Sequence, residues 1–158
     1  MIGLALETAR RDLGSENPKR AVELAAYFTH CQLQVVHLQL AIRLAMVQAF
    51  KMRNFGTAKG FALRLLEQGP APQVAASANK ILQHCEKNTV NAIDLDYDQY
   101  NQFVVCAASH TPIYQGSPSV QCPFCHASYR LEYKDSLCLV CQISKVGVNA
   151  SGMVMNAE

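Results

Sequence analysis

Four cysteines late in the chain form two Cys-x-x-Cys pairs: Cys122 with Cys125, and Cys138 with Cys141. Two thiolates spaced in this way on a tight turn supply half of a tetrahedral zinc shell, and a second turn completes it. The twelve residues between the pairs can form two short strands joined by a turn. This spacing is typical of a zinc ribbon, and it predicts one structural zinc ion bound by four sulfurs.

Other uses of these cysteines stay open. Iron also binds four thiolates, and cysteine can serve as a small buried apolar residue. A redox dithiol is less favoured, because a Cys-x-x-Cys of that kind usually opens a helix in an α/β setting, which is absent here. His126 directly follows the first pair, in a position where histidine tolerates a left-handed backbone, and it could compete as a ligand.

A closed four-sulfur site has no open position for water or substrate, so it predicts structural support and no catalysis. The sequence also lacks HExxH, GxSxG and phosphate-loop motifs. We therefore expect no enzymatic activity. The remaining cysteines and several histidines stand apart from one another and are expected to be structural or solvated: Cys31, Cys85, Cys106, His30, His37, His84 and His110.

The charge of the chain is divided unevenly. Residues 1–87 carry eleven Lys or Arg and six Asp or Glu, which gives +5, whereas residues 88–158 carry three and six, which gives −3. A nucleic-acid-binding ribbon needs clustered cations, but the cysteine-bearing part has only Arg130, Lys134 and Lys145. A nucleic-acid-binding or transcription-associated adaptor therefore stands as the alternative function, and the charge argues against it.

The composition suggests a cytosolic protein with a covered surface. The seven cysteines are odd in number, and the first residues lack the pattern of a signal peptide, so a reducing compartment is expected. No apolar run is long enough to span a membrane. Charged residues make up only 16% of the chain, against roughly 25% in an average domain. Another protein is expected to cover part of the exterior.

The first half of the chain carries start and stop signals for helices. Asn17 can cap a helix whose first turn holds Pro18, because proline there gives up an amide that has no partner. Asn54 is expected to cap a later helix, and Gly69 suits the left-handed end of that helix. Apolar residues recur at helical spacing within each segment. The expected helices cover residues 17–30, 33–53, 54–69 and 73–88.

The helix over residues 33–53 is the most apolar of the four. Its polar residues gather in one narrow stripe, so we expect it to be buried on most sides. Gln39 and Arg43 interrupt the apolar side and are expected to reach a satisfied partner, the alternative being a contact to another bound protein. Consecutive antiparallel helices of this length predict a piece of α-solenoid.

The character of the sequence changes after residue 88. Helical periodicity stops, and short β-branched or aromatic segments alternate with Gly, Pro and Ser. The prediction is an α+β protein: an α-solenoid-like helical region over 1–88, a linker over 89–102 and a small β module of zinc-ribbon type over 103–158. The acidic linker and the opposite charges of the two parts predict that they pack as one rigid unit.

Several tracts resemble the carboxy-terminal domain of the coatomer α subunit, α-COP. They include AAYFTHCQLQVVHLQLAIRLAMVQAFKMRNFGTAKGFALRLLEQG, YDQYNQFVVCAASHTPIYQGSPSVQCPFCHASY and VCQISKVGVNASG, and the similarity covers nearly the whole chain. The tract CAASHTPIYQG is the most specific part. Members of that family are structural subunits of the COPI vesicle coat.

The resemblance implies a place, a role and partners. The chain would lie in the cytoplasm, on the cytosolic face of Golgi membranes and COPI vesicles, and would reach the membrane only through the assembled coat. It would serve Golgi-to-ER and intra-Golgi transport by binding ε-COP, a solenoid of the tetratricopeptide type, together with other coatomer subunits. Cargo recognition would belong to two β-propellers that these 158 residues do not include.

The site for ε-COP is expected in the segment from Phe103 to Val120. It combines apolar and aromatic residues with prolines that restrict the backbone, which lowers the ordering cost of binding. A protruding hairpin of this kind could enter the concave face of a solenoid. The alternative is that its apolar residues belong to the β module's own core. The expected contacts are Phe103, Pro112, Ile113, Tyr114 and Val120.

Overall fold

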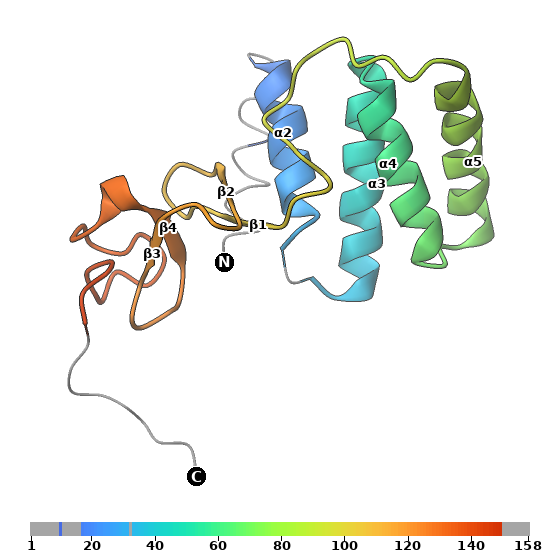
Figure 1. Ribbon diagram of the computed structural model, residues 1–158. Coiled ribbons are helices and arrows are strands. Elements are labelled where there is room, and N and C mark those ends of the chain that lie inside the picture. The colour runs from blue at the N-terminus through green and yellow to red at the C-terminus, as the bar shows by residue number, and fades with distance from the viewer. Residues whose placement is uncertain (1–9, 11–16, 32, 150–158) are drawn as a thin grey trace. The chain divides into compact units, whose positions relative to one another are not determined.

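The computed structural model describes residues 10, 17–31 and 33–149 of the chain. Within the described residues, the chain divides into a helical unit that ends at residue 99 and a β-rich unit that begins at residue 100. The ends of the expected helical region and β module, 1–9, 11–16 and 150–158, lie outside the described residues. The predicted α+β class is confirmed, with helices and small antiparallel sheets in separate parts of the chain (Figure 1).

The helical unit is a row of helices that run alternately up and down (Figure 1). Each helix packs on the next one in the chain. No helix in the described part of the chain has both the length and the apolar character that crossing a membrane requires. The bounds are Pro18–Phe28 for α2, Val35–Lys51 for α3, Phe55–Glu67 for α4 and Pro72–Lys87 for α5.

The helix start and stop signals predicted from the sequence are confirmed in part. The Asn17 side chain accepts a hydrogen bond from the Arg20 amide at 3.0 Å, and Pro18 occupies the first turn of α2, as predicted. Gly69 ends α4 with a φ of 59°. Asn54 stands at the start of α4 but makes no capping hydrogen bond, so the expected role of its side chain is wrong. That side chain is fully buried and binds another segment of the chain.

Helix α3 is covered more fully over residues 41–50 than in its first turns. Its buried face consists of Ala41, Ile42, Ala45, Met46 and Ala49, mostly small residues that let neighbouring helices approach closely. The expectation of burial on most sides is wrong for the first turns, where Val35, Val36 and Leu40 are 57–67% exposed. Gln39 donates to the Gln68 carbonyl at 2.9 Å and so has the satisfied partner that was expected, whereas Arg43 is exposed.

Residues 89–99, which we call the return segment, pack on the helical unit. Figure 1 shows this segment running from the end of α5 back along the row towards α2. Asn54 holds it by two hydrogen bonds to the backbone of Ile93, of 2.8 and 2.9 Å. The ring of Tyr97 stacks on Phe61 at 5.5 Å between centroids. The return segment therefore packs against the helical core through partly buried side chains. Limited proteolysis can test the prediction that both units move as one.

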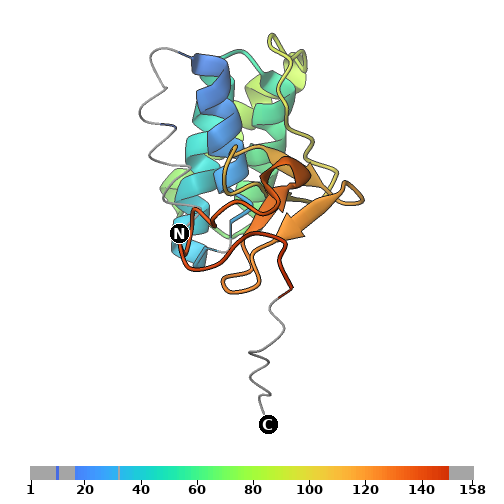
Figure 2. The ribbon, with the colours of Figure 1, turned by 90° about the vertical axis from the view of Figure 1, so that its left-hand side faces the viewer.

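The β-rich unit is built from short hairpins (Figure 2, orange to red). Strand β1, Phe103–Val105, pairs antiparallel with β2, Pro112–Tyr114. Strand β3, Ser119–Gln121, pairs antiparallel with β4, Ser128–Arg130, which leads into the 3₁₀ turn η1, Leu131–Tyr133. Leu137 and Lys145 form a last isolated bridge. Each of these pairings encloses a loop that begins with a cysteine.

The three loops repeat at a spacing of sixteen residues. They begin at Cys106, Cys122 and Cys138, whose carbonyls accept hydrogen bonds from the amides four residues later at 2.9–3.0 Å. Those later residues all have a left-handed backbone, with φ of 53°, 58° and 56°. We call these the first, second and third loops: residues 106–110, 122–126 and 138–142.

Candidate metal centre

The second and third loops bring their cysteines together. The Sγ atoms of Cys122, Cys125, Cys138 and Cys141 all lie within 4.8 Å of one another. The distance from Cys122 to Cys141 is 3.7 Å, and that from Cys125 to Cys138 is 3.5 Å. The close pairs therefore join one loop to the other, which is the arrangement that a shared ion between two turns requires.

These distances fit a tetrahedral ion and exclude disulfides. Four sulfurs at about 2.3 Å from a central zinc ion lie about 3.8 Å from one another. A disulfide would instead bring two sulfurs to about 2.0 Å. All four cysteines are free thiols. The predicted ligand set therefore converges on one point with the spacing of a four-sulfur metal shell.

Backbone geometry positions the ligands within each loop. The Cys122 amide donates to the Ala127 carbonyl, and the Cys138 amide donates to the Ser144 carbonyl, so that each loop is closed across its base. The left-handed residues at the loop ends, His126 and Gln142, turn the chain back after the second cysteine. Both loops therefore present two sulfurs on one side of a tight turn, which is the local structure that Cys-x-x-Cys favours.

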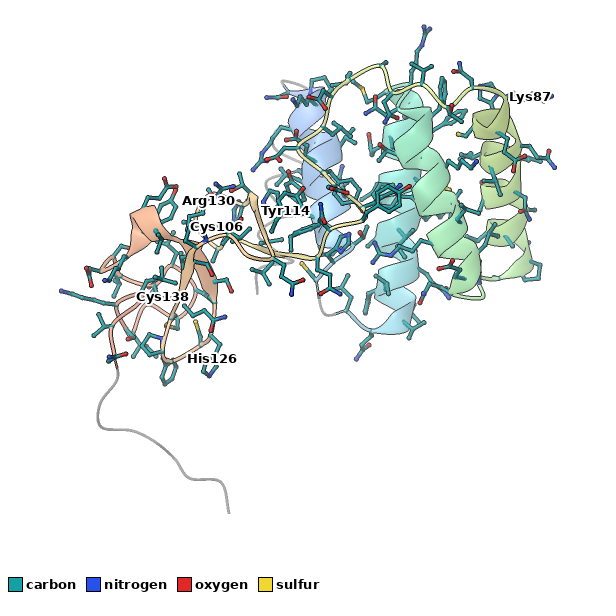
Figure 3. The ribbon with its side chains drawn as sticks, viewed as in Figure 1. Lys87, Cys106, Tyr114, His126, Arg130 and Cys138 are labelled. Carbon is teal, nitrogen blue, oxygen red and sulfur yellow. The ribbon has the colours of Figure 1, made fainter. Side chains whose placement is uncertain are left out.

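His126 does not join the cluster. Its side chain is exposed at the edge of the hairpin (Figure 3), and the group of metal-ligating atoms found among the described residues contains the four cysteines without it. Cys122 and Cys138 are buried, whereas Cys125 and Cys141 are half-buried. The site therefore lies at the surface of the unit, with two ligands inside and two near solvent.

The thiols differ in their acidity. Burial raises the pKa of Cys125 to about 12. Burial alone would also raise the pKa of Cys138, but hydrogen bonds from the Tyr129 hydroxyl and the Cys141 amide outweigh it and lower that pKa to about 6. A bound cation deprotonates coordinating thiols outright because it offsets their negative charge. The Cys138 thiol therefore ionises more readily than that of Cys125.

The donor set fits zinc and leaves no room for catalysis. Soft thiolates in a tetrahedral arrangement select zinc or iron. With four protein ligands the shell is closed, so no position is open to water or substrate. The residues that would hold the ion are the two cysteines of the second loop and the two of the third. An ion held by these residues would act as a structural cross-link between two hairpins.

The other cysteines lie apart from the cluster. Cys31 is half-buried beside the Tyr27 carbonyl, at 3.9 Å, and Cys85 is fully buried in the helical core. Cys106 is fully buried in the β-rich unit, at the start of the first loop. The first loop has Ser109 in the place of a second cysteine, so it offers one thiol where the others offer two.

The expected partner contacts fall into two groups. Pro112 and Ile113 are buried, and Ile113 packs in the core of the β-rich unit at 6% exposure, so these two side chains present little surface. Phe103 and Tyr114 are half-buried cross-strand neighbours whose rings meet edge to face, 5.5 Å apart. Val120 is half-buried against the same core.

Sequence reasoning missed two features of this site. Tyr129 lies against the cysteine cluster, with its hydroxyl 3.1 Å from the Sγ of Cys138. The sixteen-residue repeat, which relates Cys106 to Cys122 and Cys138, was also missed. Its signal was present in the sequence as the parallel stretches CAASH and CPFCH, but the single cysteine of the first stretch hides the likeness.

Comparison with known proteins gives a consistent set of matches. The family model that describes the C-terminus of the coatomer (COPI) alpha subunit matches residues 1–158. Coatomer subunit alpha-1 of Arabidopsis thaliana is 42% identical over 154 residues, which cover 98% of this chain and 13% of that protein. Coatomer subunit alpha of Dictyostelium discoideum is 39% identical over 160 residues, with 97% and 13% covered.

A fungal relative agrees with these two. Coatomer subunit alpha of Saccharomyces cerevisiae is 39% identical over 156 residues, which cover 97% of this chain and 13% of that protein. The similarity therefore extends over nearly all of this sequence. The chain spans only about an eighth of the length of these relatives.

Proposed function

This chain belongs to the family of carboxy-terminal domains of coatomer (COPI) alpha subunits, and we propose that it is a structural, non-enzymatic part of a COPI vesicle coat. The observation that carries this proposal is the family match over residues 1–158. The closed four-sulfur site supports a structural role, because it offers no open coordination position.

The proposal includes one structural zinc ion bound by Cys122, Cys125, Cys138 and Cys141. The spacing of the sulfurs supports it, and so does the small size of the hairpin core. A β-rich unit of this size buries too little apolar surface to be stable without a cross-link. When bound, the ion joins the second and third loops and thereby fixes the hairpins relative to each other.

The proposed partner is ε-COP, with which the chain would form a heterodimer within the coat. The resemblance to α-COP supports this partner, and the hairpin of β1 and β2 supports the site. Phe103 and Tyr114 form a cross-strand aromatic pair on the hairpin. Aromatic residues of this kind carry much of the binding energy at protein interfaces. The buried Pro112 and Ile113 would hold the hairpin in shape.

The proposed setting follows from the family. The chain would act in Golgi-to-ER and intra-Golgi transport, on the cytosolic face of the membrane, and would meet the membrane only through the assembled coat. A nucleic-acid-binding function is not favoured. The net charge of −3 over residues 88–158 repels phosphates, and the family match points to a coat.

Co-purification with ε-COP tests the partner and its site together. The double variant Phe103→Ala with Tyr114→Ala is expected to weaken binding more than tenfold, since loss of central aromatic residues typically costs about 2 to 4 kcal/mol. The control is Tyr100→Ala, which removes an 87% exposed tyrosine outside the hairpin. Metal analysis of each sample shows whether the hairpins are intact.

The outcomes separate the parts of the proposal. A zinc-loaded wild-type chain that does not bind ε-COP would overturn the partner. A folded, zinc-loaded double variant that binds ε-COP as tightly as the wild type would overturn the site alone. Preferential binding to a duplex oligonucleotide at physiological salt would favour the adaptor function instead.

A further inference from the structure

Tyr129 connects the second hairpin to a ligand of the third loop. It lies on β4, directly after the second loop, and its side chain is fully buried. Its hydroxyl oxygen is 3.1 Å from the Sγ of Cys138 and 3.0 Å from the amide nitrogen of Leu139. One phenol group thus contacts both the first cysteine of the third loop and the backbone beside it.

The hydrogen bonds around this phenol fix the direction of its proton. The Leu139 amide has only a hydrogen to give, so the Tyr129 oxygen must accept from it. The phenol's own hydrogen then needs an acceptor, because buried polar groups are almost always hydrogen-bonded. The Cys138 sulfur stands at hydrogen-bonding distance, and the Tyr129 side chain is fully shielded from bulk water. The O–H bond therefore points at the sulfur.

We propose that Tyr129 is a positioning residue for the metal centre, donating its hydroxyl hydrogen to the Cys138 sulfur and thereby fixing the orientation of that ligand. This inference rests on the proposed zinc site. Groups that hydrogen-bond metal ligands typically change metal affinity by about 10- to 100-fold when they are removed. Tyr129 touches the ligand and not the ion, so it acts through Cys138.

The position of Tyr129 explains why such a contact matters here. The two cysteine pairs are twelve residues apart, and the third loop is closed by a bridge of its own between Leu137 and Lys145. The phenol lets β4 hold the third loop near the second loop before an ion arrives. Holding ligands in place in this way strengthens binding because less freedom is lost when the ion binds.

The repeat supplies an internal contrast. Sixteen residues before Tyr129, the first hairpin has Ile113, which is buried in the same core but has no hydroxyl. That hairpin also lacks the second cysteine of its loop. The phenol therefore occurs in the hairpin that faces a metal-binding sulfur, and an apolar side chain fills the corresponding place where no cysteine pair stands. Core packing alone would require only the ring of Tyr129 and not its hydroxyl group.

The test compares wild-type protein with Tyr129→Phe, which keeps the ring and removes only the hydroxyl group. Zinc affinity is measured by competition with a chelator, and cobalt-loaded protein gives the spectrum of the metal–thiolate bonds. We expect one metal per chain in both proteins, an affinity about 10- to 100-fold weaker in the variant, and a shift of its thiolate-to-cobalt band to lower energy. Loss of a hydrogen bond makes the sulfur a better electron donor, which explains the shift.

The matched control is Tyr133→Phe, which removes a hydroxyl from the neighbouring ring, 6.4 Å from that of Tyr129 between centroids. It should leave the zinc affinity and the cobalt band unchanged. A Tyr129→Phe protein with the wild-type affinity and cobalt band would overturn this inference and leave the zinc proposal standing. A wild-type protein that binds no metal would instead overturn the zinc proposal itself.

A second measurement needs no variant. In wild-type protein loaded with an NMR-active cadmium isotope, the NMR signal of the Tyr129 hydroxyl hydrogen should show scalar coupling to the metal through the Cys138 sulfur. This measurement keeps the inference testable if Tyr129→Phe does not fold. A resolved hydroxyl signal without coupling to cadmium would contradict the hydrogen bond to the ligand.

Discussion

The first loop of the β-rich unit and the second and third loops share a backbone but differ in chemistry. In all three, the carbonyl of the leading cysteine accepts from an amide four residues later, and that later residue has a left-handed backbone. The second and third loops each add a second cysteine, whereas the first loop has Ser109 there. The loop fold is therefore set by backbone hydrogen bonds, and the proposed metal binding depends on one further side chain in each loop.

In the first loop, hydrogen bonds supply the kind of link that the proposed zinc ion would supply between the second and third loops. Burial by itself raises the pKa of Cys106, but hydrogen bonds from the Ser109 hydroxyl and the Arg130 amide contribute to lowering that pKa overall. The Arg130 guanidinium also donates to the Thr111 hydroxyl and to the Pro112 carbonyl, both at 2.9 Å. Figure 3 shows Cys106 and Arg130 on the same side of the hairpins. The first loop is thus tied to β4 directly, without an ion.

The largest effect is expected from breaking a metal-binding loop. Cys138→Ser removes one ligand and leaves an incomplete shell, and structural zinc contributes on the order of 10 kcal/mol of binding free energy. We expect zinc to be lost and the hairpins to unfold while α2 to α5 stay folded. Metal analysis and amide NMR spectra of the same sample measure both effects. A zinc-free variant with unchanged hairpin signals would contradict this prediction.

A smaller effect is expected from the matched change in the first loop. Cys106→Ser removes a buried sulfur from a loop that binds no ion, so it should lower the free energy of unfolding of the β-rich unit by about 1–3 kcal/mol. One zinc ion per chain should remain. Denaturant unfolding of zinc-loaded protein measures the loss. Complete loss of zinc from this variant would show that the first loop takes part in the metal centre.

Adding a second cysteine to the first loop tests whether two thiols there are enough to bind a further ion. Ser109→Cys gives the first loop the same two thiols as the others, but it supplies only half of a shell, and a structural zinc site needs four ligands. We expect the metal content to stay at one ion per chain and the stability to change by less than about 1 kcal/mol. Two zinc ions per chain in this variant would mean that another pair of ligands faces the first loop.

The smallest effects are expected at the left-handed residues. His126→Gly and His110→Gly remove a Cβ atom from a backbone in which only glycine is unstrained, so each should raise the free energy of unfolding by up to about 1 kcal/mol. The control Lys134→Gly changes a residue with a φ of −57° and should destabilise by about 0.5–1 kcal/mol. Opposite signs at His126 and His110 would contradict the equivalence of the loops.

Much of this molecule could be predicted from local sequence signals. Asn17 and Pro18 mark the start of α2, and the Cys-x-x-Cys spacing places two sulfurs on each tight turn, because short-range geometry decides both features. The packing of the return segment on the helices could not be predicted. It depends on Asn54, whose side chain hydrogen-bonds to backbone thirty-nine residues away. A side chain at the start of a helix carries no sign of whether it caps that helix or binds a distant segment.

The candidate site shows the same division. The ligands follow from spacing, but Tyr129 matters because β4 is antiparallel to β3 and ends beside the third loop. The burial of Pro112 and Ile113 also depends on tertiary packing. Apolar residues in a short strand predict that strand equally well whether they face the core or a partner. Only the packing of the first hairpin on Cys106 and Tyr129 places Ile113 inside.

The metal content and sulfur coordination of anaerobically purified wild-type protein show directly whether the four cysteines bind zinc. Elemental analysis combined with X-ray absorption at the zinc edge should give one zinc ion per chain bound by four sulfurs at about 2.3 Å. Cys122, Cys125, Cys138 and Cys141 would then be its ligands. Well under one metal ion per chain in a sample whose hairpins give ordered NMR signals would contradict the proposed zinc site.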